Sequence, residues 1–228
     1  MVVGDPYIGD IKMSKKKYPI SIEVSGRLAM FSRPDTGSER KSYIAPPMSA
    51  AKGLLESIFF YEYTNVIPVA VKICSKPVFM DYSYTYGGLL RKSDLISSGD
   101  SQKIKESVLE NVRYQIFAMV ETAKYHPVHN PAHAHQAQFM RNIAKSACRK
   151  TPFLGREEMV CDYWGPLLPD TSPVDINKVI PCMLRSVFDK KKNGSVNPSY
   201  LLDVEVSGGI LEYDHGLSKV EVEKCLMS

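Results

Sequence analysis

The sequence predicts an α+β fold: a ferredoxin-like or RRM-type βαββαβ domain with an extended hairpin, followed by a small antiparallel β-sheet domain. Two observations support this prediction. Up to residue 150, segments with strand or helix periodicity follow one another as strand, helix, strand, strand, strand, helix. After Pro152 the chain becomes proline-rich, with short strand patterns. We therefore expect a flexible leader at 1–17, an RRM-like domain at 18–150 and a C-terminal antiparallel β domain at 151–228.

The first strand and the first helix have clear local signals. Apolar and polar residues alternate over 20–24, which predicts a half-buried strand that ends at Gly26. Ser49 is the expected N-cap of a helix running to about Tyr61. Gly53 lowers helix propensity by roughly 1 kcal/mol relative to Ala. We interpret it as a point where the helix packs closely on the sheet, with contact to a phosphate as the alternative.

The later elements follow from the same periodicities. The patterns predict strands at 66–73 and 78–82, an extended hairpin or loop with a glycine-rich tip up to Ile96, a polar connection at 97–106, a long central strand at 112–120, and a helix at about 133–147. Further short strands are expected at 180–190, 200–206 and 210–213, with turns at 190–194 and 207–209. Alternating tyrosines at 82, 84 and 86 indicate strand packing, with base stacking as the alternative.

Composition excludes several classes of protein. The 228 residues are 44% hydrophobic and 24% charged with a net charge of +4, as in an ordinary globular protein. The five cysteines form no C-x-x-C pair, so we expect neither a disulfide framework nor a zinc site. We find no signal peptide and no apolar run long enough to span a membrane, and we therefore expect a cytoplasmic protein.

The stretch 122–156 is the strongest local signal of function. It contains no Asp or Glu, yet it carries six lysines and arginines and four of the chain's five histidines, at 126, 129, 133 and 135. Cations of this density suit a polyanion, because lysine and arginine hold phosphate oxygens and a histidine near neutrality can move a proton. The alternative is a solvated basic helix face with loop histidines.

Motifs for other chemistry are missing from the sequence. There is no P-loop, no G-x-G-x-x-G after a strand and no H-E-x-x-H, so we expect no nucleotide cofactor and no metal. A basic groove with histidine can still cleave RNA without a metal. A base takes the proton of the 2′-hydroxyl, an acid protonates the leaving 5′-oxygen, and cations stabilise the phosphate.

Two ordered blocks of residues carry a family resemblance. The first block consists of Ser38-Glu39-Arg40-Lys41-Ser42-Tyr43, Pro46 and the run SAAKGLLESI at 49–58. The second consists of His135, Phe139 and Arg141, followed by Cys148, Pro152, Leu154, Gly155 and Glu158. Together they resemble a CRISPR-associated family, the Cas-five family in its type I-C (D) variant. The similarity covers about residues 18–160 well and the C-terminal third only in general character.

This resemblance implies an RRM-like domain followed by a small antiparallel β domain. It also implies metal-independent cleavage of CRISPR precursor RNA within its repeats, without a cofactor. The protein would then stay on the crRNA 5′ handle in a Cascade complex, beside the backbone and large subunits, and would meet target DNA through that complex. No membrane is involved. The alternative is a catalytically inactive subunit that binds the handle.

The resemblance also assigns candidate residues. The family's catalytic histidine falls on His135, whereas Phe59 and Ala134 occupy the places of its catalytic tyrosine and lysine. We predict that His135, His133 and Tyr43 form the catalytic set, with Tyr61 and Lys52 able to compensate; Tyr43 is otherwise a packed ring or a stacking platform. The expected RNA-binding residues are Arg40, Lys41, Lys52, Arg141, Lys145, Arg149 and Lys150. Surface charge without a ligand is the alternative for these cations.

Overall fold

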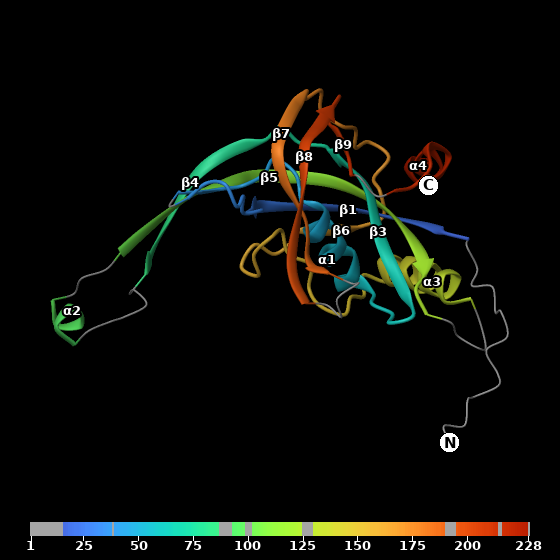
Figure 1. Cartoon of the computed structure of the whole chain (residues 1–228), viewed down its shortest axis with the longest axis horizontal. Helices are drawn as coiled ribbons and strands as arrows, with labels where there is room; N and C mark the ends of the chain where they lie inside the picture. The colour runs from blue at the N-terminus through green and yellow to red at the C-terminus, as the bar shows by residue number, and fades with distance from the viewer. Residues whose placement is uncertain are drawn as a thin grey trace, which may run out of the picture.

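The fold is a curved sheet with helices packed against it (Figure 1). The computed structural model describes residues 16–37, 39–86, 93–98, 102–124, 130–189, 195–213 and 216–227. The elements are β1 (Tyr18–Ala29), β2 (Arg40–Lys41), α1 (Met48–Ile58), β3 (Thr64–Ile73), β4 (Val78–Tyr86), α2 (Ser93–Ser97), β5 (Gln102–Thr122), α3 (Pro131–Ala144), β6 (Tyr163–Gly165), β7 (Lys178–Asp189), β8 (Ser195–Ser207), β9 (Ile210–Glu212) and α4 (Lys219–Leu226).

Strand β5 organises the sheet. Within the described residues the strand order is β6-β1-β5-β3-β9-β8-β7, and β2 and β4 pair with β5 outside this path. β1 and β3 flank β5 on either side, and both pair with it antiparallel. The short β2–β5 pairing is parallel. The fold is therefore mixed α/β with a mostly antiparallel sheet, which confirms the predicted class at that level.

The extended hairpin is longer than predicted. β5 begins at Gln102, where a polar connection was expected, and its first half pairs antiparallel with β4. This ribbon projects away from the helices, with α2 beyond its end (Figure 1). The inner part of the ribbon packs Met80 and Tyr82 with the buried Val108, whereas residues 102–106 are mostly polar and give no apolar alternation in the sequence. The predicted glycine-rich tip, the 190–194 turn and residues 125–129 lie outside the described residues, as does nearly all of the 1–17 leader.

Two of the predictions for α1 are wrong. Pro47 is the N-cap, and its carbonyl accepts a hydrogen bond from the Ala51 N–H at 2.9 Å. Ser49, the expected N-cap, therefore lies inside the helix. Gly53 is exposed, and a Cβ built there would meet no atom within 4 Å. Close packing of α1 on the sheet therefore does not explain this glycine.

Helix α3 begins earlier than predicted because the chain supplies a side-chain cap. The Asn130 side chain accepts hydrogen bonds from the N–H groups of Ala132 and His133, and Pro131 occupies the first turn. The helix ends at Ala144 instead of about Ala147. His133 and His135 therefore lie in its first two turns.

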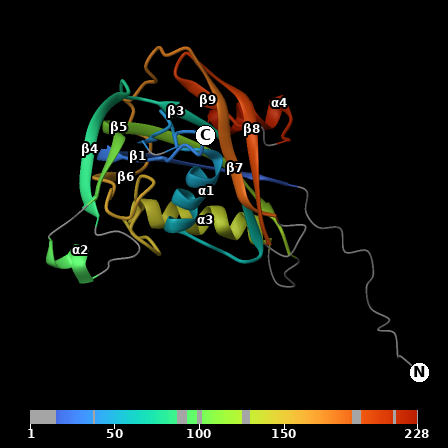
Figure 2. The same ribbon diagram turned by 60° about the vertical axis from the view of Figure 1, so that its left-hand side comes forward.

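The two faces of the sheet bury different helices (Figure 2). The main core packs the β5 side chains Tyr114, Ile116 and Ala118 with residues of α1 and α3. Phe117 points to the opposite face and packs with Val222 and Cys225 of α4. Helix α4 was not predicted, although Ser218 and Glu221 form a capping box at its start. No helix in the described ranges is both long and apolar enough to cross a membrane.

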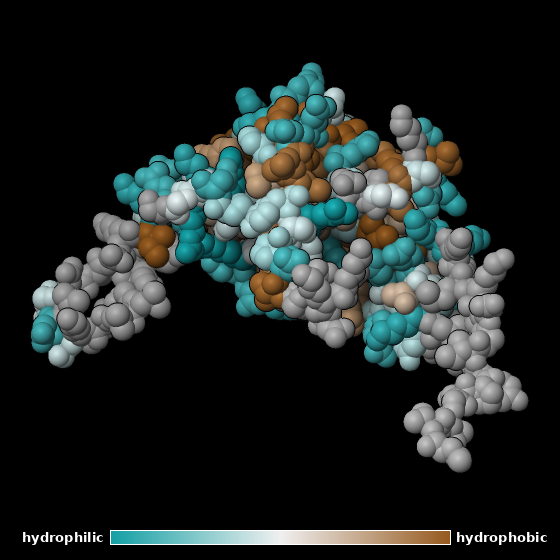
Figure 3. Space-filling view, in the orientation of Figure 1, coloured by the Kyte–Doolittle hydropathy of each residue, from teal (hydrophilic) through white to brown (hydrophobic). Residues whose placement is uncertain are grey.

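The C-terminal third contributes strands to the same sheet. β6 pairs with β1, and β9 joins β3 to the β7–β8 hairpin. A domain boundary after residue 150 stays a prediction. Hydrophobic side chains gather on the surface over β7 and β8 (Figure 3), where Val179 is 51% and Leu202 is 74% exposed.

Candidate functional site

His135 is buried beneath the last turn of α1, with 1% of its surface exposed. Its Nδ1 lies 2.7 Å from the Thr64 Oγ1. The Thr64 hydroxyl donates its one proton to the Tyr61 carbonyl at 2.9 Å, so Nδ1 must carry the proton and donate to Oγ1. The other ring nitrogen, Nε2, is then an acceptor. Nε2 is buried and has no hydrogen-bond partner among the described residues.

Aromatic rings surround this imidazole. Phe59 meets it edge-on with ring centroids 4.9 Å apart, and Phe139 stacks at 6.5 Å. Burial lowers the pKa of His135 to about 4, because the charged imidazolium loses its hydration there. At neutral pH the ring is therefore uncharged: it can accept a proton once Nε2 is uncovered, and it holds no proton on that nitrogen to give away.

His133 precedes His135 by two residues on α3, and Tyr61 and Tyr63 follow Phe59 in the chain. His133 is exposed in the first turn of α3, with its ring 5.4 Å from that of Tyr18. The Tyr61 ring lies 6.3 Å from Phe59 and 5.2 Å from Tyr63. The two other predicted histidines of the basic stretch lie outside the described residues. In the described ranges no group of three or more His, Cys, Asp or Glu side chains could hold a metal ion.

Tyr43 is not brought to this site. It precedes α1, whereas His135 contacts the residue that follows α1. The Tyr43 ring is 2% exposed, its hydroxyl donates to the Cys182 carbonyl at 2.8 Å, and burial raises its pKa to about 12. With Tyr213, whose hydroxyl donates to the Pro46 carbonyl at 2.6 Å, it fastens the segment before α1 to the C-terminal strands. This geometry supports the packed-ring interpretation of Tyr43.

The predicted RNA-binding cations fall into separate groups. Arg141, Lys145, Arg149 and Lys150 are exposed on and after α3. Lys52 is on α1, where its Nζ lies 3.1 Å from the Asn65 Oδ1 and 3.5 Å from the Glu56 carboxylate. Arg40 and Lys41 form β2, which pairs with β5 at Glu106 and Ser107. Thr64 pairs with the other end of β5, at Thr122, so the structure does not place Arg40 and Lys41 beside His135.

Thr64 and Phe60 were missed by the sequence interpretation. Thr64 follows the helix as the first residue of a strand, and a hydroxyl in that position gives no sign that it will anchor an imidazole. Phe60 is 48% exposed, which is unusual for a large aromatic ring beside a helix end. The run of four aromatics at residues 59, 60, 61 and 63 was the available signal.

The shifted pKa of His135 predicts a stability change with pH. Its pKa is about 4 in the folded chain and about 6.5 when unfolded, so the unfolded chain binds the additional proton. Above pH 6.5 the ring is neutral in both the folded and the unfolded chain, so its titration does not change the free energy of unfolding there. As pH falls from 6.5 to 4, the free energy of unfolding should drop by about 3 kcal/mol from this group alone. Urea unfolding of His135→Gln, followed across the same range, should show a shallower decline than the wild type, since all other groups titrate in both. Parallel curves would contradict the burial of His135.

Comparisons with known proteins give a consistent result. Residues 20–163 match the model of the family described as CRISPR-associated protein, Cas5d. The chain is 30% identical over 150 residues to a Thermus thermophilus protein named CRISPR pre-crRNA endoribonuclease Cas5d, a match that covers 64% of this chain and 63% of that protein. A Mannheimia succiniciproducens protein of the same name is 26% identical over 176 residues, which cover 70% of this chain and 77% of that one.

Solved structures resemble most of the chain at low identity. The crystal structure of a CRISPR-associated protein aligns with a TM-score of 0.65 at 19% identity, covering 90% of this chain and 96% of that chain. A chain of a CRISPR RNA-guided surveillance complex aligns with a TM-score of 0.51 at 14% identity, covering 92% and 100%. These likenesses concern the fold.

Proposed function

Because the chain belongs to the CRISPR-associated protein family Cas5, in its Cas5d form, we propose that it cleaves CRISPR precursor RNA within the repeats. Both curated relatives are named pre-crRNA endoribonucleases, although the match spans less than two thirds of the length of the Thermus protein. The observation that carries the proposal is the Thr64–His135 hydrogen bond. It fixes the tautomer of an imidazole whose Nε2 has no other partner among the described residues, next to a surface of exposed cations.

The proposed reaction needs no metal. When RNA binds and the Phe59 ring moves aside, Nε2 of His135 takes the proton of a 2′-hydroxyl, and the 2′-oxygen attacks the adjacent phosphorus. The bond to the 5′-oxygen breaks, and the exposed His133 gives that oxygen a proton. The products are a 2′,3′-cyclic phosphate and a 5′-hydroxyl. Arg141, Lys145, Arg149 and Lys150 hold the flanking phosphates.

The product should stay bound as part of a larger assembly. We propose that the chain holds the crRNA 5′ handle in a type I-C Cascade complex, where it contacts the backbone and large subunits and meets target DNA through the complex. The likeness to a chain of a surveillance complex supports a fold suited to that place. We also propose that β1, α1, β3, β5, α3 and β6 form a ferredoxin-like unit, with β4 and the first half of β5 as its insertion. The strand order β6-β1-β5-β3 supports this.

A second function, handle binding without cleavage, is favoured by three observations. Phe59 and Ala134 lack the hydroxyl and the ammonium group that the family resemblance places there. In addition, Nε2 of His135 is covered in the described conformation. A subunit with these features can bind RNA through the same cations and leave cutting to another nuclease.

One assay separates the two functions. The purified chain is incubated with a labelled repeat RNA in EDTA, alongside the same RNA with a 2′-deoxy nucleotide at the cut position. We expect cleavage of the first RNA only, with equal affinity for both, because the 2′-hydroxyl is the nucleophile. Tight binding without cleavage would establish the handle-binding function instead. Absence of binding would reject both.

A further inference from the structure

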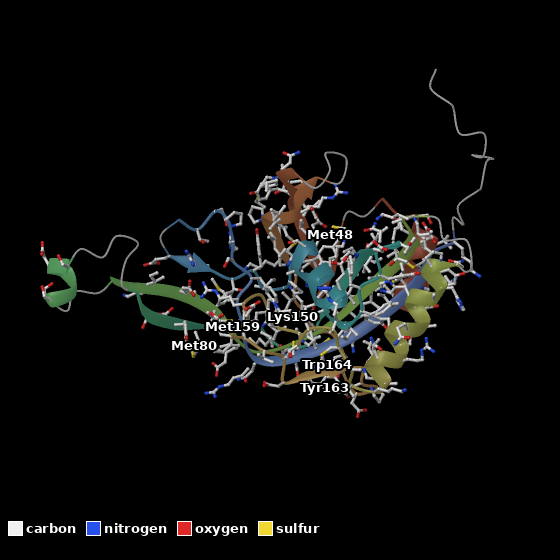
Figure 4. All side chains as sticks on the ribbon, turned by 90° about the horizontal axis from the view of Figure 1, so that it is seen from below. Met48, Met80, Lys150, Met159, Tyr163 and Trp164 are labelled. Carbon is white, nitrogen blue, oxygen red and sulfur yellow. The ribbon has the colours of Figure 1, made fainter. Side chains whose placement is uncertain are left out.

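A groove separates the last two turns of α1 from the segment 149–155. Its volume is about 450 Å³, within the usual range for small-ligand sites. Figure 4 views the molecule from below, with Lys150 beside the ribbon of α1. Gly53 lies on the α1 wall, and a Cβ there would point into open space. The missing side chain leaves the groove wider than any other residue would at this position.

Two aromatic rings and two cations form the groove wall. The guanidinium of Arg149 lies 5.4 Å from the centroid of the Phe60 ring, and the ammonium of Lys150 lies 5.2 Å from that of Phe153. These are the distances of cation–π contacts. Each pair offers a flat surface next to a positive charge, which is the combination that binds single-stranded nucleic acid.

The wall is held in place by the backbone. The N–H groups of Arg149 and Lys150 donate to the Ser57 carbonyl at 2.9 and 3.0 Å, and the Arg149 N–H also approaches the Ile58 carbonyl at 3.3 Å. These bonds give partners to carbonyls at the end of α1, where the Ile58 carbonyl also accepts from the Asn142 Nδ2 at 3.2 Å. The two cations are therefore positioned before any ligand arrives, which lowers the entropy cost of binding.

The acidic groups near the groove are already paired. Glu56 lines the groove and lies 3.5 Å from the Lys52 ammonium. Glu157 pairs with Lys150 at the surface, where both side chains are more than half exposed. Such an exposed pair contributes little to stability, so a phosphate can replace the carboxylate at low cost.

We propose that this groove binds one unpaired RNA nucleotide, with its base stacked on the Phe60–Arg149 platform and its phosphate on Arg149 and Lys150. The proposal rests on the function proposed above in that RNA is the ligand. An unpaired base is required because a base inside a helix does not expose its face. The groove thereby selects a single-stranded position next to the cut, separately from His135.

The test measures the affinity of the full chain for labelled repeat RNA by fluorescence anisotropy. Phe60→Leu should weaken binding roughly tenfold, because it removes the stacking surface and retains an apolar side chain. Gly53→Gln should weaken binding to a similar extent by filling the groove. Met140→Ala, an exposed position on α3 that does not line the groove, is the control and should keep affinity within about twofold.

Two further measurements identify the contact. Arg149→Gln should lower the slope of log affinity against log salt by about one, whereas Phe60→Leu should leave that slope unchanged. One abasic site in the RNA should reproduce the Phe60→Leu loss and add nothing to it when both changes are combined.

The outcomes separate this proposal from the one on which it rests. If the wild type binds repeat RNA and both Phe60→Leu and Gly53→Gln bind equally well, the groove is not a nucleotide site and the proposed function stands. If Gly53→Gln weakens binding but no abasic site in the RNA reproduces the Phe60→Leu loss, the groove contacts only the RNA backbone and base stacking is rejected. If the wild type does not bind repeat RNA, both proposals fail.

Discussion

Replacing His135 with alanine is expected to slow cleavage of repeat RNA at least a hundredfold, since a positioned base contributes roughly 10²- to 10⁴-fold to such a reaction. RNA affinity should change by less than about twofold, because the buried ring carries no charge and the exposed cations remain. Single-turnover cleavage and anisotropy on the same preparation measure the two quantities. The matched control is Met140→Ala, an exposed position on the same helix, which should leave both unchanged.

The acid side of the pH profile of cleavage tests His135 as the base. In the free protein the pKa of His135 is lowered to about 4 by burial, so the ring stays unprotonated above pH 5. With limiting RNA, the fall in rate on the acid side should lie between about pH 5 and pH 4, where the His135 ring takes up a proton. A rate that already falls well above about pH 5 on the acid side would contradict this assignment.

Folding defects must be separated from loss of chemistry. His135→Ala also removes the ring that packs against Phe59, so its melting temperature will fall, and a second variant is needed. His135→Gln retains a polar side chain of similar length opposite Thr64 and should lose cleavage equally. If either variant is folded and cleaves at the wild-type rate, His135 is not the base. The handle-binding function, or a different base, would then replace the present assignment.

The sequence predicted the elements whose periodicity is tied to the core. The centre of β5 is apolar on both faces because both are covered, and α1 was found from its stripe of Ala50, Leu54 and Ile58. Elements without such a core signal were missed. β6 is three residues long, and the outer half of β5 belongs to a projecting ribbon.

Site residues were harder to predict than elements for a physical reason. His135 was chosen from its place in the family motif, but its pKa depends on burial beside Phe59 and Phe139, and these contacts form only when α1 and α3 pack together. Tyr43 carries a hydroxyl in the expected motif, yet that hydroxyl donates a hydrogen bond to a carbonyl more than a hundred residues away in the chain. Charge and residue type are visible in a sequence, whereas burial and hydrogen-bond partners depend on long-range contacts.

Glu23 and the cations of the basic surface also differ in burial and hydrogen-bond partners, which residue type does not reveal. Both involve charged side chains, but the Glu23 carboxylate is fully buried on β1 and faces away from the candidate site. The backbone of Leu168 and the side chain of Thr171 both donate to it, so the 166–171 segment is arranged around this carboxylate. Its role is therefore structural, and its replacement should have the largest effect on stability.

Glu23→Ala is expected to lower the free energy of unfolding by about 3 kcal/mol, because it breaks a buried network and leaves polar groups without partners. The carboxylate lies 3.0 Å from each of four donors: the Arg113 Nη1, the Gln115 Nε2, the Leu168 N–H and the Thr171 hydroxyl. Arg113 is 38% exposed and can turn to water, so the main cost falls on the buried Gln115 and the Leu168 N–H.

Thermal unfolding followed by circular dichroism measures this loss, and for a chain of this size it should lower the melting temperature by roughly 6–12 °C. Glu23→Gln keeps the shape and loses the charge, so it should fall between the wild type and the alanine variant. Glu205→Ala on the exposed face of β8 is the control and should shift the melting temperature by about 1 °C or less. If this network holds the 166–171 segment, removing a fully buried carboxylate that binds four donors must lower the melting temperature. A Glu23→Ala shift no larger than that of the control would therefore show that the network does not hold this segment.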